Sequence, residues 1–216
     1  MSSAHENSGW RLRWRAVGLL TCLAAIGGAG PGYAEDVVRV EEQWELRIAT
    51  PDPGSSAPQV TCVMSPVGDI LGLHAVFEIN QRTQPSFSPG GLQLQVWNGD
   101  TPWARVEAGA TQPLSQGDET VAWTQVMEIA GGVLRFSVCG GESVTWGAFG
   151  GSDLTIEVPT DLANLNQYDP LVSIHHSAVG YAANRVKSLS LKRVRIVSAT
   201  GQLAEDSTVH VIHALP

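Results

Sequence analysis

Hydrophobic and polar residues alternate along most of the chain from residue 37 onward, and no segment repeats its apolar residues at a convincing helical period. The clearest case is LGLHAVFEIN, residues 71–80, whose apolar positions share one face: Leu71, Leu73, Ala75, Phe77 and Ile79. The opposite face of this segment carries His74, Val76, Glu78 and Asn80. A period of two predicts a β-strand with one face on a core.

Further segments with the same period predict further strands. They are residues 40–50, 58–64, 92–97, 120–129, 133–139, 142–147, 154–158, 171–176, 188–197 and 207–213. Gly131 and Gly132 separate two of these strands and predict a tight hairpin, because glycine adopts positive φ without steric cost. The helix candidate is TDLANLNQY, residues 160–168, one or two turns long, with Thr160 or Asp161 as its N-cap.

About eleven or twelve strands, with glycine and proline at the turns, predict an all-β fold: a two-sheet antiparallel β-sandwich. A single sheet of that width would leave an apolar face uncovered. No internal repeat, low-complexity tract or linker divides the chain. Residues 35–216 are therefore expected to form a single sandwich domain.

The N-terminus has the features of a secretory signal peptide. Three arginines, at residues 11, 13 and 15, precede the apolar run AVGLLTCLAAIGG, and Gly32 and Ala34 stand at the −3 and −1 positions before Glu35. We expect cleavage near Ala34 and export to the periplasm, the cell surface or the outside. A membrane anchor is the alternative, but the run is short and rich in Gly and Ala for a membrane span. No span is expected in the mature chain.

The charge balance narrows the classes of partner. Residues 1–34 hold three of the 13 basic and one of the 21 acidic residues, so the mature chain carries 10 basic and 20 acidic ones. Such an excess of negative charge argues against nucleic acid and anionic membrane surfaces as partners. It is compatible with neutral polymers such as polysaccharides, with a surface protein, or with no ligand.

Half of the mature basic residues gather in or beside SLSLKRVRIV, residues 188–197: Arg185, Lys187, Lys192, Arg193 and Arg195. Leu189 and Leu191 lie on one phase of this segment, whereas Val194 and Ile196 lie on the other. An extra residue at Lys192–Arg193 would restore a common apolar face, which predicts a β-bulge. The stretch is then a bulged strand, at the edge of a sheet, whose charges deter edge pairing. An anion-binding stripe is the alternative.

Two stretches resemble strands of concanavalin A-like and laminin-G-like jelly-roll sandwich domains, as found in exported bacterial proteins. LKRVRIV, residues 191–197, is similar to their closing strand, and GLQLQVWNGD, residues 91–100, looks like a strand with its hairpin tip. The resemblance implies a jelly-roll sandwich and glycan binding or, less often, glycan cleavage. A fold does not by itself confer either activity.

The predicted ligand-binding surface is the outward face of residues 92–97. Gln93, Gln95 and Trp97 form a row there, and the neighbouring segment would add His74, Glu78 and Asn80. Sugars stack their C–H faces on aromatic rings and pair their hydroxyls with amides and carboxylates. Trp123 and Trp146 would widen this platform. The alternative is that these tryptophans pack inside the core.

No catalytic residue is predicted. Glycoside hydrolysis needs two carboxylates, whereas FEIN places Glu78 beside Asn80, and Glu128 is alone. The Arg, Gln, His and Tyr set of polysaccharide lyases has no matching motif here, although one of each type is available: Arg82, Gln125, His175 and Tyr181. A glycan-active hydrolase or lyase is thus the least favoured function, after a binding domain and a structural or adhesive domain without a small-molecule site.

Metal and disulfide chemistry are weakly indicated. His175 and His176 are adjacent, so on a strand they would point to opposite faces, and no zinc site is expected. Acidic residues in turns leave calcium open, but without a binding motif. Cys62 and Cys139 are two cysteines of an exported chain and would form one disulfide or stay separate thiols. Their strand phases place them on unlike faces.

Overall fold

The structure, a computed structural model, describes residues 35–49, 58–79, 91–108, 114, 116–180, 182–201 and 203–216. These residues all lie within one compact unit, Glu35–Pro216. The predicted signal peptide lies outside the described residues. Among the described helices, none has the length and apolar character that a membrane crossing requires.

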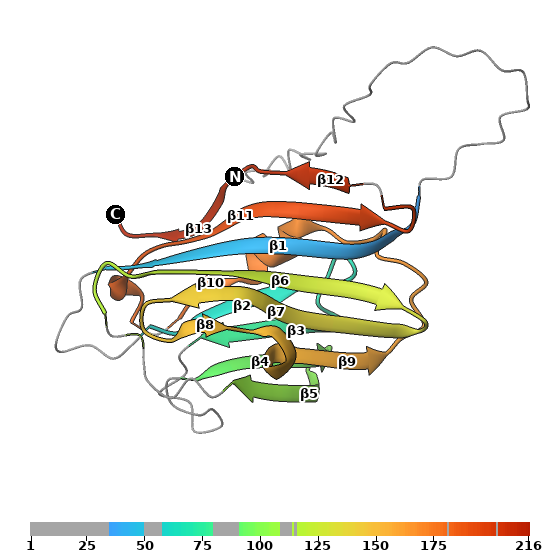
Figure 1. Cartoon of the computed structure of the whole chain (residues 1–216), viewed down its shortest axis with the longest axis horizontal. Coiled ribbons are helices and arrows are strands. Elements are labelled where there is room, and N and C mark those ends of the chain that lie inside the picture. The colour runs from blue at the N-terminus through green and yellow to red at the C-terminus, as the bar shows by residue number, and fades with distance from the viewer. Residues whose placement is uncertain are drawn as a thin grey trace, which may run out of the picture. The chain divides into compact units, whose positions relative to one another are not determined.

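Two antiparallel sheets form the fold, which confirms the predicted β-sandwich (Figure 1). The eight-stranded sheet has the order β12-β11-β1-β6-β7-β8, and in addition β13 pairs with β11 and β9 pairs with β7. Its strands are β1 Val37–Ile48, β6 Thr120–Ala130, β7 Val133–Ser143, β8 Gly147–Phe149, β9 Thr155–Pro159, β11 Val186–Ser198, β12 Leu203–Asp206 and β13 His210–Ala214.

The five-stranded sheet has the order β10-β2-β3-β4-β5. Its strands are β2 Val60–Met64, β3 Leu73–Ile79, β4 Leu92–Asn98, β5 Thr101–Ala108 and β10 Ala178–Val179. Three short helices complete the described fold: α1 Pro170–His176, η1 Gly151–Leu154 and η2 Ala183–Arg185. The second sheet lies behind the first in the view of Figure 1.

The core fills the space between the sheets, and aromatic rings stand at its centre. Trp44 of β1 stacks on Trp123 of β6, with ring centroids 6.4 Å apart and an angle of 7° between the planes. Phe77 of the other sheet meets Trp123 edge-on at 5.6 Å. Offset stacking and edge-on contacts are the favoured aromatic arrangements. These three rings therefore tie the two sheets together.

The segment 171–176, predicted as a strand, is instead the helix α1. Asp169 provides its N-cap, because its side chain accepts a hydrogen bond from the backbone N–H of Leu171 at 2.9 Å. Pro170 follows at the first helical position, where its missing N–H costs nothing. The cap and the proline therefore override the weak strand pattern.

The predicted helix over 160–168 is also wrong. This segment is irregular and contains one turn, in which the Tyr168 N–H donates to the Leu165 carbonyl at 3.0 Å, while other backbone groups bond to distant parts of the fold. The Leu165 N–H donates to the Val37 carbonyl at 2.8 Å, and the Asn166 side chain accepts from the Val37 N–H at 2.8 Å. Pairing with β1 thus replaces the internal hydrogen bonds that a helix needs.

The bulge predicted in residues 188–197 is present, but the strand is not at an edge. Gln43 of β1 pairs with Arg193 and Trp44 pairs with Leu191, so Lys192 is the extra residue. The shift keeps Leu191 and Val194 both buried. β11 lies inside the sheet, with β1 on one side and β12 and β13 on the other. It is therefore not the closing strand of the chain.

Residues 142–147, predicted as a strand, contain the turn between β7 and β8. Glu119 holds this turn: its carboxylate accepts hydrogen bonds from the Ser143 hydroxyl, from the Thr145 N–H at 2.8 Å and from the Thr145 hydroxyl at 2.5 Å. A buried carboxylate that accepts several hydrogen bonds fixes the loop that supplies them.

Replacing Gly150 by alanine is expected to destabilise the fold by about 2–3 kcal/mol. Gly150 has φ 102°, and a Cβ atom built on it would lie 2.5 Å from the Val138 carbonyl oxygen. The neighbouring Gly151 has φ 78° with open space around a Cβ, so Gly151→Ala carries only the conformational cost. Urea unfolding of both variants checks this prediction, and equal losses would contradict the close contact.

Candidate functional site

The outward face of the five-stranded sheet brings together most of the predicted sugar-binding residues. His74 pairs with Trp97 across β3 and β4, and Glu78 pairs with Gln93. Gln95 lies between them on the same face of β4. The alternation that placed the apolar residues in the core thus also assembles this polar row. Asn80 lies outside the described residues.

Side-chain hydrogen bonds join this row into a network. Gln95 Nε2 donates to Glu78 Oε2 at 2.8 Å and to Gln93 Oε1 at 2.7 Å. Gln93 Nε2 donates in turn to Glu107 Oε1 on β5 at 2.9 Å. His74 is held separately, by a contact of 3.0 Å between Nδ1 and the Gly72 carbonyl oxygen. The network fixes the orientation of both amides, which is a requirement for selective recognition.

The row is less open than the sequence predicts. Each of its four polar members at positions 74, 78, 93 and 95 is less than a tenth exposed, and Trp97 is half-buried. The accessible part of the face lies on β5, where Trp103 is 49% exposed. Arg105 and Glu107 follow at alternate positions on the same face, with 3.5 Å between Arg105 Nε and Glu107 Oε1.

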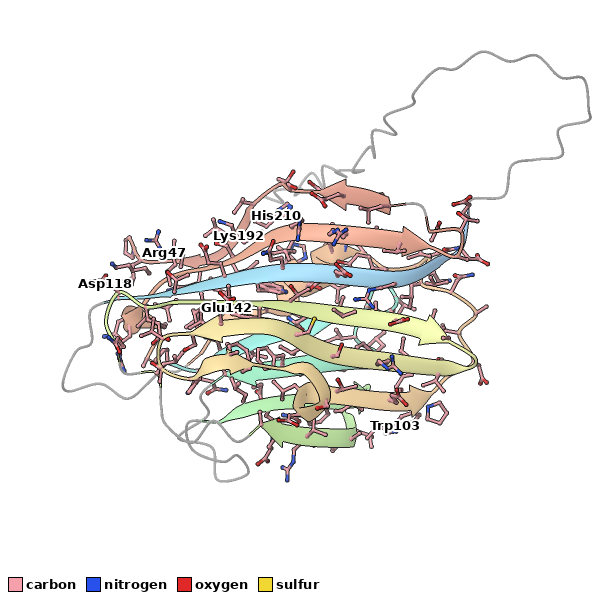
Figure 2. All side chains as sticks on the ribbon, in the orientation of Figure 1. Arg47, Trp103, Asp118, Glu142, Lys192 and His210 are labelled. Atoms are coloured by element: carbon pink, nitrogen blue, oxygen red, sulfur yellow. The ribbon has the colours of Figure 1, made fainter. Side chains whose placement is uncertain are left out.

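Sequence reasoning missed β5 and these three residues. The signal was available: Gly99 and Asp100 form a turn directly after β4, and alternation resumes in Thr101–Ala108. Ala104 and Val106 pack on the core between the exposed positions. Figure 2 shows Trp103 at the outer edge of the sandwich, near the β4–β5 hairpin and far from Lys192.

The other two tryptophans do not widen the platform. Trp123 is 1% exposed and lies in the core, on the opposite sheet. Trp146 lies in the turn after β7 and meets Phe149 edge-on at 5.9 Å. Trp123 is therefore a core residue, as the alternative interpretation held, whereas Trp146 is half-buried and packs on Phe149.

The remaining chemical candidates are dispersed. Of the residues compared with the lyase set, Gln125 is buried on the core face of β6 and His175 is on α1, while Arg82 and Tyr181 lie outside the described residues. His176 follows His175 on the helix rather than on a strand. Within the described residues, no group of three His, Cys, Asp or Glu side chains is placed to hold a metal ion.

Cys62 and Cys139 are free thiols. Cys62 is buried on the inner face of β2, and Cys139 is half-buried on β7 of the other sheet. Burial raises the pKa of both thiols. The structure thus agrees with the separate-thiol alternative.

The basic stretch is neutralised by carboxylates of the same chain. Lys187 pairs with Asp118, and Lys192 Nζ lies 3.6 Å from Glu45 Oε1. The other ion pairs are Arg193–Glu205 at 3.7 Å, Arg195–Glu41 at 3.1 Å and Arg195–Glu205 at 3.3 Å. Arg185 is buried and donates to the Leu114 carbonyl at 3.4 Å. These pairings do not favour an anion-binding stripe.

A shallow hollow on the eight-stranded sheet is a second polar surface. Its lining includes Arg39, Glu128, Arg135 and Glu157, with hydroxyls from Ser and Thr. Arg39 Nη1 lies 3.0 Å from Glu128 Oε2, and Arg135 Nη2 lies 2.5 Å from Glu157 Oε1. Positive and negative groups balance there, and no aromatic ring lines it. It therefore suits a sugar less well than the face that carries Trp97 and Trp103.

A third polar cluster was not predicted: the carboxylate of Glu42 is buried between the sheets. Glu42 is 0% exposed and points inward from β1. Its Oε1 accepts from the hydroxyls of Ser173 at 2.5 Å and Tyr168 at 2.8 Å, and its Oε2 accepts from Trp44 Nε1 at 3.1 Å. Burial raises the pKa of Glu42 to about 7, against the lowering effect of these hydrogen bonds.

Comparison with known proteins assigns no family. No family model and no curated protein matches the chain. Among solved structures, the chain is similar to the enzymatically active domain of tailspike protein 2 of bacteriophage CBA120, with 12% identity, a TM-score of 0.30, and coverage of 78% of this chain and 24% of that one. The full-length tailspike protein 2 from an Escherichia coli O157:H7 bacteriophage gives the same identity and TM-score, with 78% and 21% covered. The chain spans less than a quarter of either protein, and likeness this distant assigns no function.

Proposed function

We propose that the protein is an exported, non-enzymatic β-sandwich domain that binds a carbohydrate on the outward face of β4 and β5. The observation that carries the proposal is the exposed indole of Trp103 beside a hydrogen-bonded amide and carboxylate network. An aromatic ring offers a stacking surface for the C–H face of a sugar, and the network offers oriented polar groups. The resemblance to concanavalin A-like and laminin-G-like domains implies the same class of ligand.

A neutral polysaccharide is the expected ligand class. Glu78 and Glu107 belong to the network, and the positive Arg105 on this face lies close to Glu107. The whole chain has a formal net charge of −8. Acidic glycans would therefore meet like charge on the protein, which slows their association and weakens their binding.

Trp103→Ala is expected to weaken glycan binding by about 10- to 100-fold, the loss of one stacking contact of about 1–3 kcal/mol. The measurement is a glycan array with the purified residues 35–216, followed by titration of any glycan that binds. Leu203→Ala is the matched control, because Leu203 is 50% exposed on β12 of the other sheet. Absence of binding to every glycan, or equal binding by both variants, would overturn the site.

A structural or adhesive domain without a small-molecule site is the second candidate. The burial of Gln93 and Gln95 supports it, because their side-chain amides already bond to groups of the protein. This alternative predicts that Gln95→Leu lowers stability while an array shows no bound glycan. Glycan cleavage is the third candidate function. It needs two carboxylates that face the substrate, and although Glu78 and Glu107 share the face, each already accepts a hydrogen bond from a glutamine.

A further inference from the structure

One segment, irregular except for the helix α1, connects the two sheets. It is held by hydrogen bonds to β1 and by the buried side chains of Leu165 and Val172. We call residues 160–177 the strap; it leaves β9, passes β1, forms α1 and ends at β10. α1 contacts β2 and β13, and it lies behind β1 and β11 in Figure 1. The eight-stranded sheet is wider than its partner, so the strap covers inner-face residues that the smaller sheet does not reach.

Glu42 is the point where the strap meets the core. Two strap hydroxyls, on Tyr168 and Ser173, donate to the same carboxylate oxygen. The strap is held further by the Leu165 N–H on Val37 and by Ser177, whose hydroxyl accepts from the Val63 N–H at 3.0 Å. A change in the charge of Glu42 therefore acts directly on two hydroxyls of the strap. β10 begins at Ala178, directly after the strap.

The Glu42 carboxylate has no countercharge. Its hydrogen-bond donors are neutral, and no Lys, Arg or His of the described residues forms an ion pair with it. The other titratable groups that face it are Cys62 of β2 and Tyr168 of the strap, and desolvation with the nearby Glu42 charge raises the pKa of both. Neither supplies positive charge, so ionising Glu42 inside the closed structure is costly.

A polar group beside Glu42, the side-chain amide of Gln125, has an unsatisfied N–H donor. Gln125 is the cross-strand neighbour of Glu42 on β6, is 2% exposed, and its Nε2 has no hydrogen-bond partner. Water admitted to this place would bond both the carboxylate and the amide. Gln125 would therefore gain a hydrogen-bond partner in any state of the protein that lets water reach this place.

We propose that Glu42 is a buried proton-binding site that controls the docking of the strap. With the proton on Glu42 the strap is closed. When the proton passes to solvent water at higher pH, the charged carboxylate favours a state in which the strap lifts and water enters. Because β10 follows the strap and pairs with β2, this opening also uncovers the edge of β2.

Hydrogen exchange of the strap tests the proposal. With intrinsic exchange rates divided out, protection of residues 160–179 is expected to fall about tenfold per pH unit between pH ~4.5 and pH ~7 and then to level off. Strap amides should exchange faster than those of β6 at each pH, since the opening is local. Glu42→Gln should abolish the pH dependence, because its side chain keeps an acceptor for the two hydroxyls but does not titrate.

Two further variants separate the proton effect from simple damage. Ser173→Ala should raise strap exchange at every pH while keeping the slope, because it removes a donor and leaves Glu42 titrating. Glu119→Gln, a change in a buried carboxylate that holds a different turn, should match the wild-type profile. A wild-type strap without pH dependence, a slope retained in Glu42→Gln, or strap exchange equal to that of β6 would overturn the proposal.

Discussion

Replacing Trp123 by alanine is expected to lower the free energy of unfolding by about 4 kcal/mol. Trp123 is 1% exposed, stacks on Trp44 of the same sheet and meets Phe77 of the other sheet. Truncation removes the transfer free energy of a large ring and leaves a cavity that both sheets would have to move to fill. Urea unfolding, followed by circular dichroism, measures the loss.

Two comparisons make this prediction specific to the core. Trp123→Phe keeps an aromatic ring between Trp44 and Phe77 and should lose clearly less. Trp146→Ala removes a half-buried ring from a turn and should also lose less. A loss below about 1 kcal/mol in Trp123→Ala would contradict the burial. If Trp123→Ala instead reduced glycan binding and left the stability unchanged, we would conclude that Trp123 belongs to the binding surface.

The sandwich could be predicted because the apolar side chains of most strands lie on one face of the strand. In β3 the apolar positions Ala75, Phe77 and Ile79 are all buried, and this pattern has no helical reading. The bulge in β11 could be predicted for the same reason. The apolar alternation changes phase between Leu191 and Val194, and one extra residue is needed to keep both on the core face. Period-two patterning thus determines both the elements and their irregularities wherever a core imposes it.

Short elements were mispredicted because capping decides them. Residues 171–176 have apolar side chains that fit a strand or a single helical turn equally well. The decisive signal is Asp169 followed by Pro170, which starts a helix at that point. Conversely, Asp161 resembles an N-cap, but Leu165 and Asn166 bond to β1 instead. Such tertiary competition is not visible in local sequence.

The candidate site was predicted in its grouping but not in its exposure. Alternation places Gln93 and Gln95 on the outward face, and the hairpin pairing brings Glu78 beside them. Glu107 of β5 completes the network that holds them. Because β5 was not recognised, its exposed Trp103 was missed as well. Glu42 was missed although the signal was present. It stands in phase with Val40 and Trp44, and a charged residue at that phase indicates a carboxylate that faces inward.

Stability should fall as the pH rises from about 4.5 to about 7, by a total of about 3 kcal/mol that is traceable to Glu42. Burial raises the pKa of Glu42 from 4.5 to about 7 in the folded protein, so the folded state binds a proton more tightly than the unfolded state in this window. An acid with a raised folded pKa stabilises the fold below its unfolded pKa and loses that contribution as the pH passes the folded value. Above pH ~7 the loss is complete and the curve levels off.

The difference in the free energy of unfolding between the wild type and Glu42→Gln isolates this effect. The other titrating groups contribute equally to both proteins and cancel. Asp118 and Asp206, whose pKa values are lowered by hydrogen bonds from Lys187 and Thr208, act at the acidic end of the range. We expect the two proteins to be similar in urea unfolding at pH ~5, and Glu42→Gln to be the more stable by about 3 kcal/mol at pH ~8. A constant difference across this range would show that the carboxyl group keeps its ordinary pKa. In that case the hydrogen bonds from Ser173, Tyr168 and Trp44 would fully offset the cost of burying the charge.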